Sequence, residues 1–146
     1  MTGPTFSRAT VAANDDPKKA GRVRLRYLWL AEESAGTVSE WARVCFPGAS
    51  SAGGFWLLPE VGDEVLVYFE NGDLNSPIVV GTLYNKVHPA PQSGLRGDGN
   101  ADGQNSARFF KSKSGHLLAF DDSPESSVTL KNAAEHKVVL KKDRVE

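Results

Sequence analysis

The chain has 146 residues, a formal net charge of −1 and one cysteine, Cys45. The near-neutral charge argues against nucleic-acid binding through bulk basic charge, and a single cysteine excludes an intrachain disulfide. We expect Cys45 to be a small buried apolar residue, because no local histidine pattern indicates a catalytic thiol. The apolar runs are shorter than the roughly 20 residues of a membrane helix, and the N-terminus lacks the layout of a signal peptide.

Strand patterns dominate the first part of the chain, and no segment shows sustained helical periodicity. The predicted strands are residues 6–13, 22–30, 40–46, 64–70 and 77–84. Residues 14–21 (NDDPKKAG) are a predicted turn cluster, and residues 31–39 are a predicted loop. Five strands of this length in so short a segment predict a small closed barrel.

Alternation assigns faces to the second predicted strand, RVRLRYLWL. One face carries the apolar side chains, which are Val23, Leu25, Tyr27 and Trp29. The other face carries a basic stripe, which consists of Arg22, Arg24 and Arg26. We expect this stripe to contact acidic groups on a neighbouring subunit or on a hub protein, because Tyr27, Trp29 and Trp41 are expected to lie away from it.

The stretch LPEVGDEVLVYFENGDLNSPIVVG carries apolar residues on both faces of a predicted strand. Val65, Val67 and Phe69 are expected to fill the barrel, whereas Leu66 and Tyr68 require a second covering layer. That layer is either another protomer or another part of this chain. The strand is predicted to end in a hairpin at Asn71-Gly72. The acidic residues of the stretch are expected in turns and at strand edges, and they are Glu60, Asp63, Glu64, Glu70 and Asp73.

An apolar segment, Phe55-Trp56-Leu57, follows a Gly/Ser-rich loop. As free surface it would favour aggregation, so it is either a contact between protomers or with a hub protein, or part of the core. Both readings stay open from the sequence.

The composition changes after residue 86. Residues 87–107 are rich in Gly, Pro, Asn, Asp and Ser, and are predicted to be a linker or a long ordered loop. Residues 111–123 and 131–143 then align at an offset of 20, with a short strand at 127–132 between them. Three short strands with few large apolar residues are expected to need copies of themselves for stability.

Four segments in order, DPKKAGRVRLRYLWL, SEWARVCFPGA, FWLLPEVGDEVLVYFENGDLNSPIVVGTLYN and KSKSGHLLAFDD, resemble the central spike proteins of contractile injection systems. This family includes phage baseplate spikes and the valine–glycine repeat tip proteins of type VI secretion. The resemblance implies an all-β chain with an oligosaccharide/oligonucleotide-binding (OB) barrel over residues 1–86, a linker over 87–107, and a trimeric β-helix or β-prism needle over 108–146.

The same resemblance implies a function without a cofactor or catalysis: a homotrimer at the tip of a contractile tail or tail-like particle that punctures the target cell envelope. Implied partners are a separate hub protein, inner-tube and baseplate proteins, and a proline-alanine-alanine-arginine (PAAR) repeat tip protein. The target membrane is contacted transiently. Assembly is expected in the cytoplasm, with outward delivery in the particle rather than through a signal peptide. The candidate trimer core consists of Phe120, Val128, Leu130, Val138 and Leu140.

The sequence also bears on three other functions: an enzyme, a metal site and a binding module. A lysozyme-like domain does not fit into residues 87–107, so an enzyme is not expected. His88, His116 and His136 are isolated in sequence, and the single metal-site candidate is His136 gathered from three chains on an axis. The main alternative is a monomeric OB module that binds an oligosaccharide or single-stranded nucleic acid.

Overall fold

The computed structural model describes residues 5–29 and 37–146. They belong to two compact units, Met1–His88 and Pro89–Glu146. Strands build both units, and the described helical segments are two short 3₁₀ turns, η2 at Glu70–Gly72 and η3 at Asp98–Asn100. The all-β prediction is therefore confirmed. Most of the predicted loop at 31–39 lies outside the described residues.

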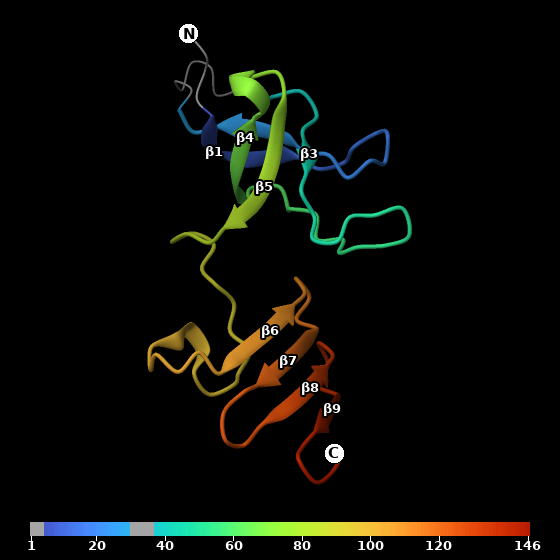
Figure 1. The fold of residues 1–146 in the computed structure, drawn as a ribbon, viewed down its shortest axis with the longest axis vertical. Helices are drawn as coiled ribbons and strands as arrows, with labels where there is room; N and C mark the ends of the chain where they lie inside the picture. Colours follow the sequence, from blue (N-terminus) through green and yellow to red (C-terminus); the bar gives the residue numbers. More distant parts are fainter. Residues whose placement is uncertain (1–4, 30–36) are drawn as a thin grey trace. The chain divides into compact units, whose positions relative to one another are not determined.

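The first unit is a five-stranded sheet with the order β2-β1-β4-β5-β3 (Figure 1). Its strands are β1 Phe6–Ala13, β2 Arg24–Tyr27, β3 Arg43–Val44, β4 Glu64–Phe69 and β5 Pro77–Leu83. Neighbouring strands are antiparallel except β3 and β5, which are parallel. β2 and β3 are shorter than the predicted strands at 22–30 and 40–46, and regular strand pairing covers only four and two residues there.

Two backbone hydrogen bonds join the ends of this sheet. The Val23 N–H donates to the Ala42 carbonyl at 2.9 Å, and the Ala42 N–H donates to the Val23 carbonyl at 2.8 Å. Val23 precedes β2 and Ala42 precedes β3, so this bridge links the two outermost strands of the order. The sheet consequently curls into the barrel that the sequence predicts.

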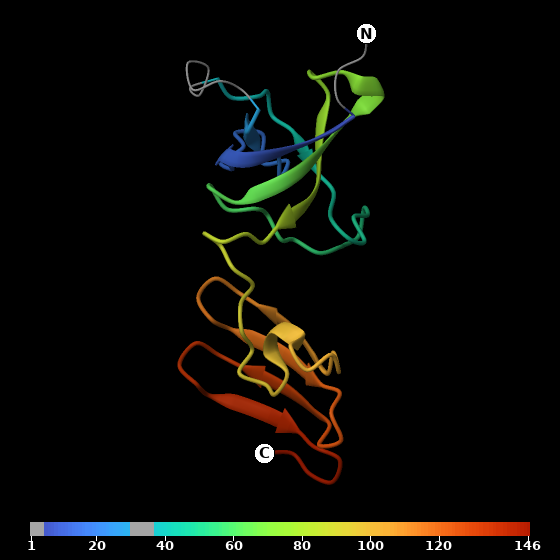
Figure 2. The same cartoon turned by 90° about the vertical axis from the view of Figure 1, so that its left-hand side faces the viewer.

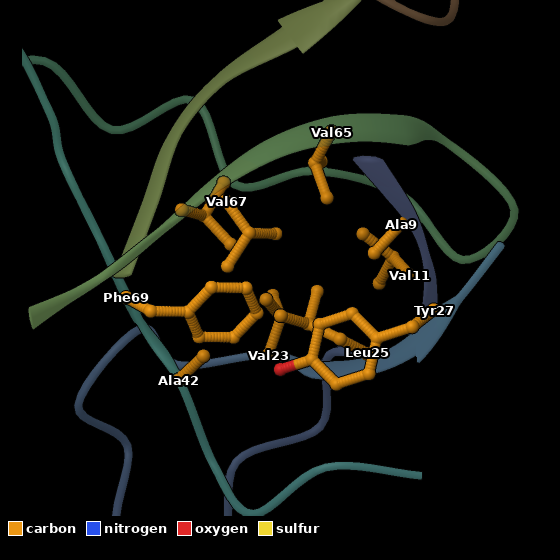
Figure 3. Packing of buried hydrophobic residues seen from close by; sticks show 10 residues of the cluster. Ala9, Val11, Val23, Leu25, Tyr27, Ala42, Val65, Val67 and Phe69 are labelled. Carbon is orange, nitrogen blue, oxygen red and sulfur yellow. The ribbon is translucent and has the colours of Figure 1, made fainter. Parts of the chain in front are cut away.

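The core of the barrel follows the predicted alternation (Figure 3). Val65, Val67 and Phe69 are fully buried, whereas the alternate β4 residues Leu66 and Tyr68 are half-buried. The buried cluster consists of Ala9, Val11, Val23, Leu25, Tyr27, Ala42, Val65, Val67, Phe69 and Val79. The Tyr27 and Phe69 rings meet inside it, with centroids 5.5 Å apart.

The prediction that Cys45 is buried is wrong, because its side chain is exposed. Val44 packs against the core, and alternation along the strand then directs the next residue outward. The Cys45 N–H still donates to the Val79 carbonyl at 2.8 Å, so this backbone remains tied to the barrel.

The turn before β2 is organised by the Asp16 carboxylate. It accepts the backbone N–H groups of Lys18 and Ala20, each at 3.0 Å. It also accepts two guanidinium bonds from Arg22, at 2.8 and 2.7 Å. The Arg22 guanidinium, helped by these backbone donors, holds the pKa of Asp16 well below its usual range.

The β4–β5 hairpin turns where the sequence predicts. Asn71 and Gly72 have φ angles of 53° and 73°, the left-handed values that an Asn-Gly pair adopts readily. Asp73 accepts the Asn75 N–H at 2.9 Å and the Ser76 hydroxyl at 3.1 Å, and Asp63 accepts the Glu60 N–H at 2.9 Å. Asp63 and Asp73 therefore stabilise turns, as expected.

Residues 46–57, called the aromatic loop below, leave β3 and cross towards β4. The Phe55 N–H donates to the Pro47 carbonyl at 3.1 Å, and the Ser50 N–H donates to the Gly53 carbonyl at 2.9 Å. The Trp56 ring stacks on the Phe46 ring, with centroids 5.4 Å apart and planes 20° apart. It also lies directly against Gly21, where a β-carbon would be 2.6 Å from the ring.

The second unit is a four-stranded antiparallel sheet in sequence order. Its strands are β6 Ala107–Lys111, β7 Leu117–Asp121, β8 Ser127–Lys131 and β9 Lys137–Leu140. The sequence predicts only three strands here, and the structure adds β6. This strand was missed because it directly follows the Gly-rich segment, whose composition is typical of a loop. The needle fold itself is not formed by one chain and stays a prediction.

The 20-residue repeat corresponds to two equivalent turns. In the first, the Ser112 N–H donates to the His116 carbonyl, and in the second the Asn132 N–H donates to the His136 carbonyl, both at 2.9 Å. The Ala133 N–H donates to His116 Nδ1 at 3.2 Å and thereby joins the two turns.

Residues 89–106 form an ordered loop rather than an extended linker. Asp98 accepts the Ser93 hydroxyl at 2.6 Å and the Gly94 N–H at 2.8 Å, and Lys111 Nζ donates to the Gln92 carbonyl at 2.9 Å. Figure 2 shows this segment, in yellow to orange, lying next to the strands that follow it. The segment belongs to the same compact unit as the sheet.

The Asp16→Asn variant should unfold at a lower urea concentration than the parent at pH 7, because the charged partner of Arg22 is lost. The pKa of Asp16 is depressed in the folded state, so its contribution is complete above the unfolded pKa of about 4 and declines as pH falls below that value. The gap between the two midpoints should therefore narrow towards pH 2. Asp15→Asn, at an exposed neighbouring carboxylate, is the matched control and should show no gap at pH 7. A gap that stays constant down to pH 2 would contradict this role.

The Gly21→Ala variant should displace Trp56 from Phe46 and destabilise the barrel. The residue has a φ of +66°, which costs an L-residue roughly 1–2 kcal/mol, and the added methyl group would overlap the indole ring. Near-UV circular dichroism and urea unfolding measure both effects. Gly81→Ala is the control, since no atom lies within 4 Å of its β-carbon position. Equal spectra for the two variants would show that Gly21 does not position Trp56.

Candidate interaction surfaces

The outer face of β4 carries the first apolar surface of the barrel. Phe6 and Ile78 are the cross-strand neighbours of Tyr68, and the Phe6 and Tyr68 rings lie 5.4 Å apart. We call Phe6, Leu66, Tyr68 and Ile78 the outer stripe. Phe6 is 55% exposed, so it covers Tyr68 only in part and extends the apolar surface. Leu66 and Tyr68 were predicted to need a cover; Phe6 and Ile78 were not singled out, although the cross-strand register places them there.

Basic side chains flank the outer stripe. Arg8 is the cross-strand neighbour of Leu66, and Arg43 is the neighbour of Ile78. Both arginines are exposed. Glu64 lies on the same face of β4 as Leu66 and Tyr68, so the stripe is an apolar band with charges of both signs beside it.

The aromatic loop is the second apolar surface of the barrel. Phe55, Trp56 and Leu57 are 64%, 66% and 46% exposed. The sequence left open whether these residues are core or surface, and the barrel leaves all three at the surface. Phe46 and Gly21, which hold Trp56 in place, were missed because their partner lies far away in sequence.

The loop and the turn that follows it lack basic residues. Residues 45–63 contain Glu60 and Asp63 and no lysine or arginine. The turn that supports Trp56 through Gly21 carries the exposed residues Lys18 and Lys19, so basic side chains also lie near the loop.

The arginine stripe is engaged within its own chain. Arg22 pairs with Asp16 at 2.7 Å, and Arg24 Nε donates to the Ser39 carbonyl at 2.9 Å. The Trp41 ring lies 5.9 Å from the Arg22 guanidinium and 6.0 Å from that of Arg24. The expectation that aromatic side chains avoid this face is wrong for Trp41, because the closing bridge beside Ala42 brings it next to β2. Arg26 is exposed on the same face, and its proposed contact with another subunit stays a prediction.

The third apolar surface belongs to the second unit. One face of its sheet carries seven large apolar side chains, and we call this set the apolar sheet face. It consists of Phe110, Leu118, Phe120, Val128, Leu130, Val138 and Leu140. The opposite face is covered, with Leu117, Ala119 and Val139 buried. The cross-strand register places all five predicted trimer-core residues on one face, and adds Phe110 and Leu118.

The exposure of this face is high for side chains of this kind. Leu130 is 62% exposed and Leu140 is 48% exposed, although both belong to regular strands. Val128 faces both Phe120 and Leu140 across its neighbouring strands. The chain therefore builds a continuous apolar face and leaves it in contact with water.

A small cavity opens at one end of the barrel. It has a volume of about 270 Å³, and its lining includes Tyr27, Trp29, Ser39 and Pro77. The Tyr27 ring stacks on Trp29 with centroids 5.6 Å apart, and its buried hydroxyl has no hydrogen-bond partner among the described residues. This cavity is the feature that a ligand-binding OB module would use.

Metal-binding groups do not gather within residues 5–29 and 37–146, where no cluster of three His, Cys, Asp or Glu side chains is suited to an ion. His136 lies in the second repeat turn, with its Nδ1 3.3 Å from Asn132 Nδ2. A metal shared by three copies of His136 stays a prediction. No helix in the described part of the chain is long and apolar enough to cross a membrane.

Comparison with known proteins gives these surfaces a context. Residues 7–84 match the type VI secretion system/phage-baseplate injector OB domain. The type VI secretion system spike protein VgrG4b of Pseudomonas aeruginosa is 40% identical over 72 residues, which is 49% of this chain and 9% of the relative. VgrG3 of Vibrio cholerae is 39% identical over 72 residues, covering 49% of this chain and 7% of the relative.

A longer similarity reaches into the second unit. The spike protein VgrG1b of Pseudomonas aeruginosa is 27% identical over 129 residues, covering 80% of this chain and 17% of the relative. The chain thus spans less than a fifth of the length of each of these relatives. The matched OB domain covers more than half of the chain and coincides with the described barrel. The chain therefore belongs to the type VI secretion system/phage-baseplate injector OB-domain family.

Proposed function

We propose that this chain is a spike component at the tip of a contractile injection particle, and that it works as a homotrimer. The apolar sheet face carries this proposal. Six of its seven side chains are between 38% and 62% exposed in the single chain, and these are Phe110, Leu118, Phe120, Leu130, Val138 and Leu140. A contiguous apolar face of this kind usually marks an interface.

Three copies of the face around one axis would bury it. Removing a half-exposed leucine or phenylalanine from water contributes on the order of 1 kcal/mol, and every copy supplies the same set. Since neighbouring strands already use the backbone groups of β7 and β8 within the chain, the copies would meet mainly through side chains. The result would be a rigid needle with a dry axis.

The mechanism is mechanical. In this proposal the barrels sit against a hub and tube, the needles point forward, and contraction drives the assembly through the target envelope. A PAAR-repeat protein would sharpen the tip. Assembly takes place in the cytoplasm, and the particle carries the trimer outward. Similarity to proteins named as type VI secretion spike proteins supports this role, and the role requires no catalytic group in the chain.

The second candidate is a monomeric OB module, and the cavity beside Tyr27 and Trp29 is the observation that favours it. An aromatic stack with polar groups around it suits a sugar ring. Mass in solution separates the two functions, because the module acts alone whereas the spike requires three copies. A monomer at micromolar concentration would overturn the spike proposal.

The Leu140→Asp variant should convert the trimer to a monomer without unfolding it. Leu140 is 48% exposed in the single chain, so the charge is tolerated there, but three carboxylates would converge and lose water in the trimer. Each copy would lose more than 1.4 kcal/mol of association energy, which raises the dissociation concentration at least tenfold. Light scattering after size exclusion measures the mass, and far-UV circular dichroism monitors the fold.

Lys137→Asp is the matched control for this variant. It introduces the same carboxylate on the same strand, in place of a lysine at an exposed position on the other face. The control should remain a trimer. If Leu140→Asp also remained a trimer, the apolar sheet face would not be the trimer core.

A further inference from the structure

We propose that Arg108 and Asp122 set the register in which the three copies pack, because the guanidinium of one copy meets the carboxylate of the next. This inference rests on the proposed trimer and names the residues that decide how its copies align. Each strand of the second unit contributes two side chains to the side of the sheet that carries the apolar sheet face. Arg108 occupies one of the two positions that β6 contributes.

Two rows of cross-strand neighbours make up this side of the sheet. One row is apolar throughout and consists of Phe110, Leu118, Leu130 and Val138. The other row begins with Arg108 on β6 and continues with Phe120, Val128 and Leu140. Asp122 directly follows β7, and alternation directs it to the same side as Phe120. The ion pair therefore lies at one end of an otherwise apolar array.

The end of the ordered loop holds this pair in place. Arg108 Nη1 donates to the Asp122 carboxylate and, at 2.9 Å, to the Asn105 carbonyl. The Asp122 N–H donates to the Ser106 carbonyl at 2.8 Å. The Asn105 N–H donates to the Asn100 side-chain oxygen at 2.6 Å. The pair is bonded through Nη1 of the guanidinium and Oδ2 of the carboxylate, so other N–H donors and the second carboxylate oxygen can bond to a neighbouring copy.

The single chain gains little from the pair. The Arg108 and Asp122 side chains are 56% and 55% exposed, and ion pairs so open to water contribute little to folding stability. Copies that pack on the apolar sheet face would remove water from both side chains. Burial of a charged pair costs free energy unless its remaining hydrogen bonds are made. The next copy supplies those bonds only when its own pair lies at the same height along the needle.

The repeat of 20 residues leaves the register of the copies open without such a pair. Leu118 and Phe120 correspond to Val138 and Leu140 at this offset. A copy displaced by two strands would therefore still place apolar side chains against apolar side chains. The same displacement would place Arg108 and Asp122 against apolar side chains, where both lose water without a new partner. A single polar position in an apolar interface fixes the register of coiled coils in the same way.

Mixing two charge variants tests the contact between copies. Arg108→Glu leaves two carboxylates in each copy, and Asp122→Lys leaves two cations. Each variant alone should raise the concentration at which the trimer dissociates at least tenfold, because like charges converge. Mixed in equal amounts, the two variants should form trimers that contain both, since the anionic pair of one copy meets the cationic pair of the next. Native mass spectrometry counts the variants in each trimer, and far-UV circular dichroism monitors the fold.

Two controls accompany the mixing experiment. Arg108→Glu combined with Asp122→Lys in one chain restores a pair of opposite charges and should assemble like the parent. The pair of Arg144 and Asp143, which is 53% and 73% exposed in the turn after β9, provides the matched control. Arg144→Glu and Asp143→Lys, made separately, should both leave the trimer intact.

Arg108→Met tests the register directly, because it replaces the charge with an apolar side chain of similar length. A spin label on Ala134→Cys in a Cys45→Ser background reports the distance between copies, and both positions are exposed. Without Arg108→Met, the labelled trimer should give one distance. Arg108→Met should add longer distances from copies displaced by two strands, which is about 10 Å across the sheet.

The outcomes separate this inference from the proposed function. A parent chain that is a monomer by light scattering overturns the trimer, and this inference with it. A parent trimer that survives both single charge variants overturns the inference alone. A mixture that stays dissociated, or an Arg108→Met trimer with a single distance, also overturns it, because the pair would then act only within its own chain.

Discussion

The bridge between Val23 and Ala42 is the interaction on which the barrel depends. Its two hydrogen bonds, at 2.9 and 2.8 Å, join strands that are far apart in the sheet order. Together with the Ser39 N–H, which donates to the Leu25 carbonyl at 2.8 Å, it gives backbone partners to edges that would otherwise be open. Through this bridge, the segment before β2 lies beside the segment that leads to β3. Trp41 thereby reaches the arginines of β2, and Gly21 comes close enough to support Trp56.

Polar and apolar groups are treated differently by this chain. Asp16, Asp73 and Asp98 each accept several hydrogen bonds from their own turn. Large apolar side chains, by contrast, stay partly exposed to water in a single chain. They belong to the outer stripe, the aromatic loop and the apolar sheet face. The hydrogen bonds of the turns therefore form within one copy, whereas much of the apolar surface stays unburied in one copy. That division suits a subunit that folds alone and reaches full stability in an assembly.

The sequence predicted most of what depends on local patterns. β1 has the predicted bounds Phe6–Ala13, and the hairpin turns at Asn71-Gly72, because strict alternation and left-handed turn residues are visible in a short window. The doubly apolar strand β4 predicted that Leu66 and Tyr68 lie outside the core. Among the trimer-core candidates, the repeat of 20 residues pairs Phe120 with Leu140, whereas Val128 and Leu130 come from the predicted strand between the two repeats.

Features that depend on distant partners were not predictable in the same way. The Trp41 ring lies beside Arg22 and Arg24, which belong to a different and earlier segment of the chain. Alternation along β2 therefore could not predict the position of this ring. Cys45 resembles a core residue by type, and only the packing of Val44 shows that it faces outward. β6 begins directly after a Gly- and Asn-rich segment, whose composition concealed the strand. For Trp41 and Cys45 the deciding contact lies with residues that are distant in sequence, whereas for β6 the composition of the preceding segment was misleading.

The two units differ in the interactions that make them rigid. The barrel gains its rigidity from closure and from a core of fully buried side chains, and one copy contains all of that core. The sheet of the second unit is open, and its turns are joined one to the next, as in the bond from the Ala133 N–H to His116. Such a repeat resists shear between its turns but has only one covered face, so bending would be resisted by whatever packs on the other face. In the proposed trimer, contact between the apolar sheet faces of the three copies would supply that resistance and would also remove their apolar side chains from water.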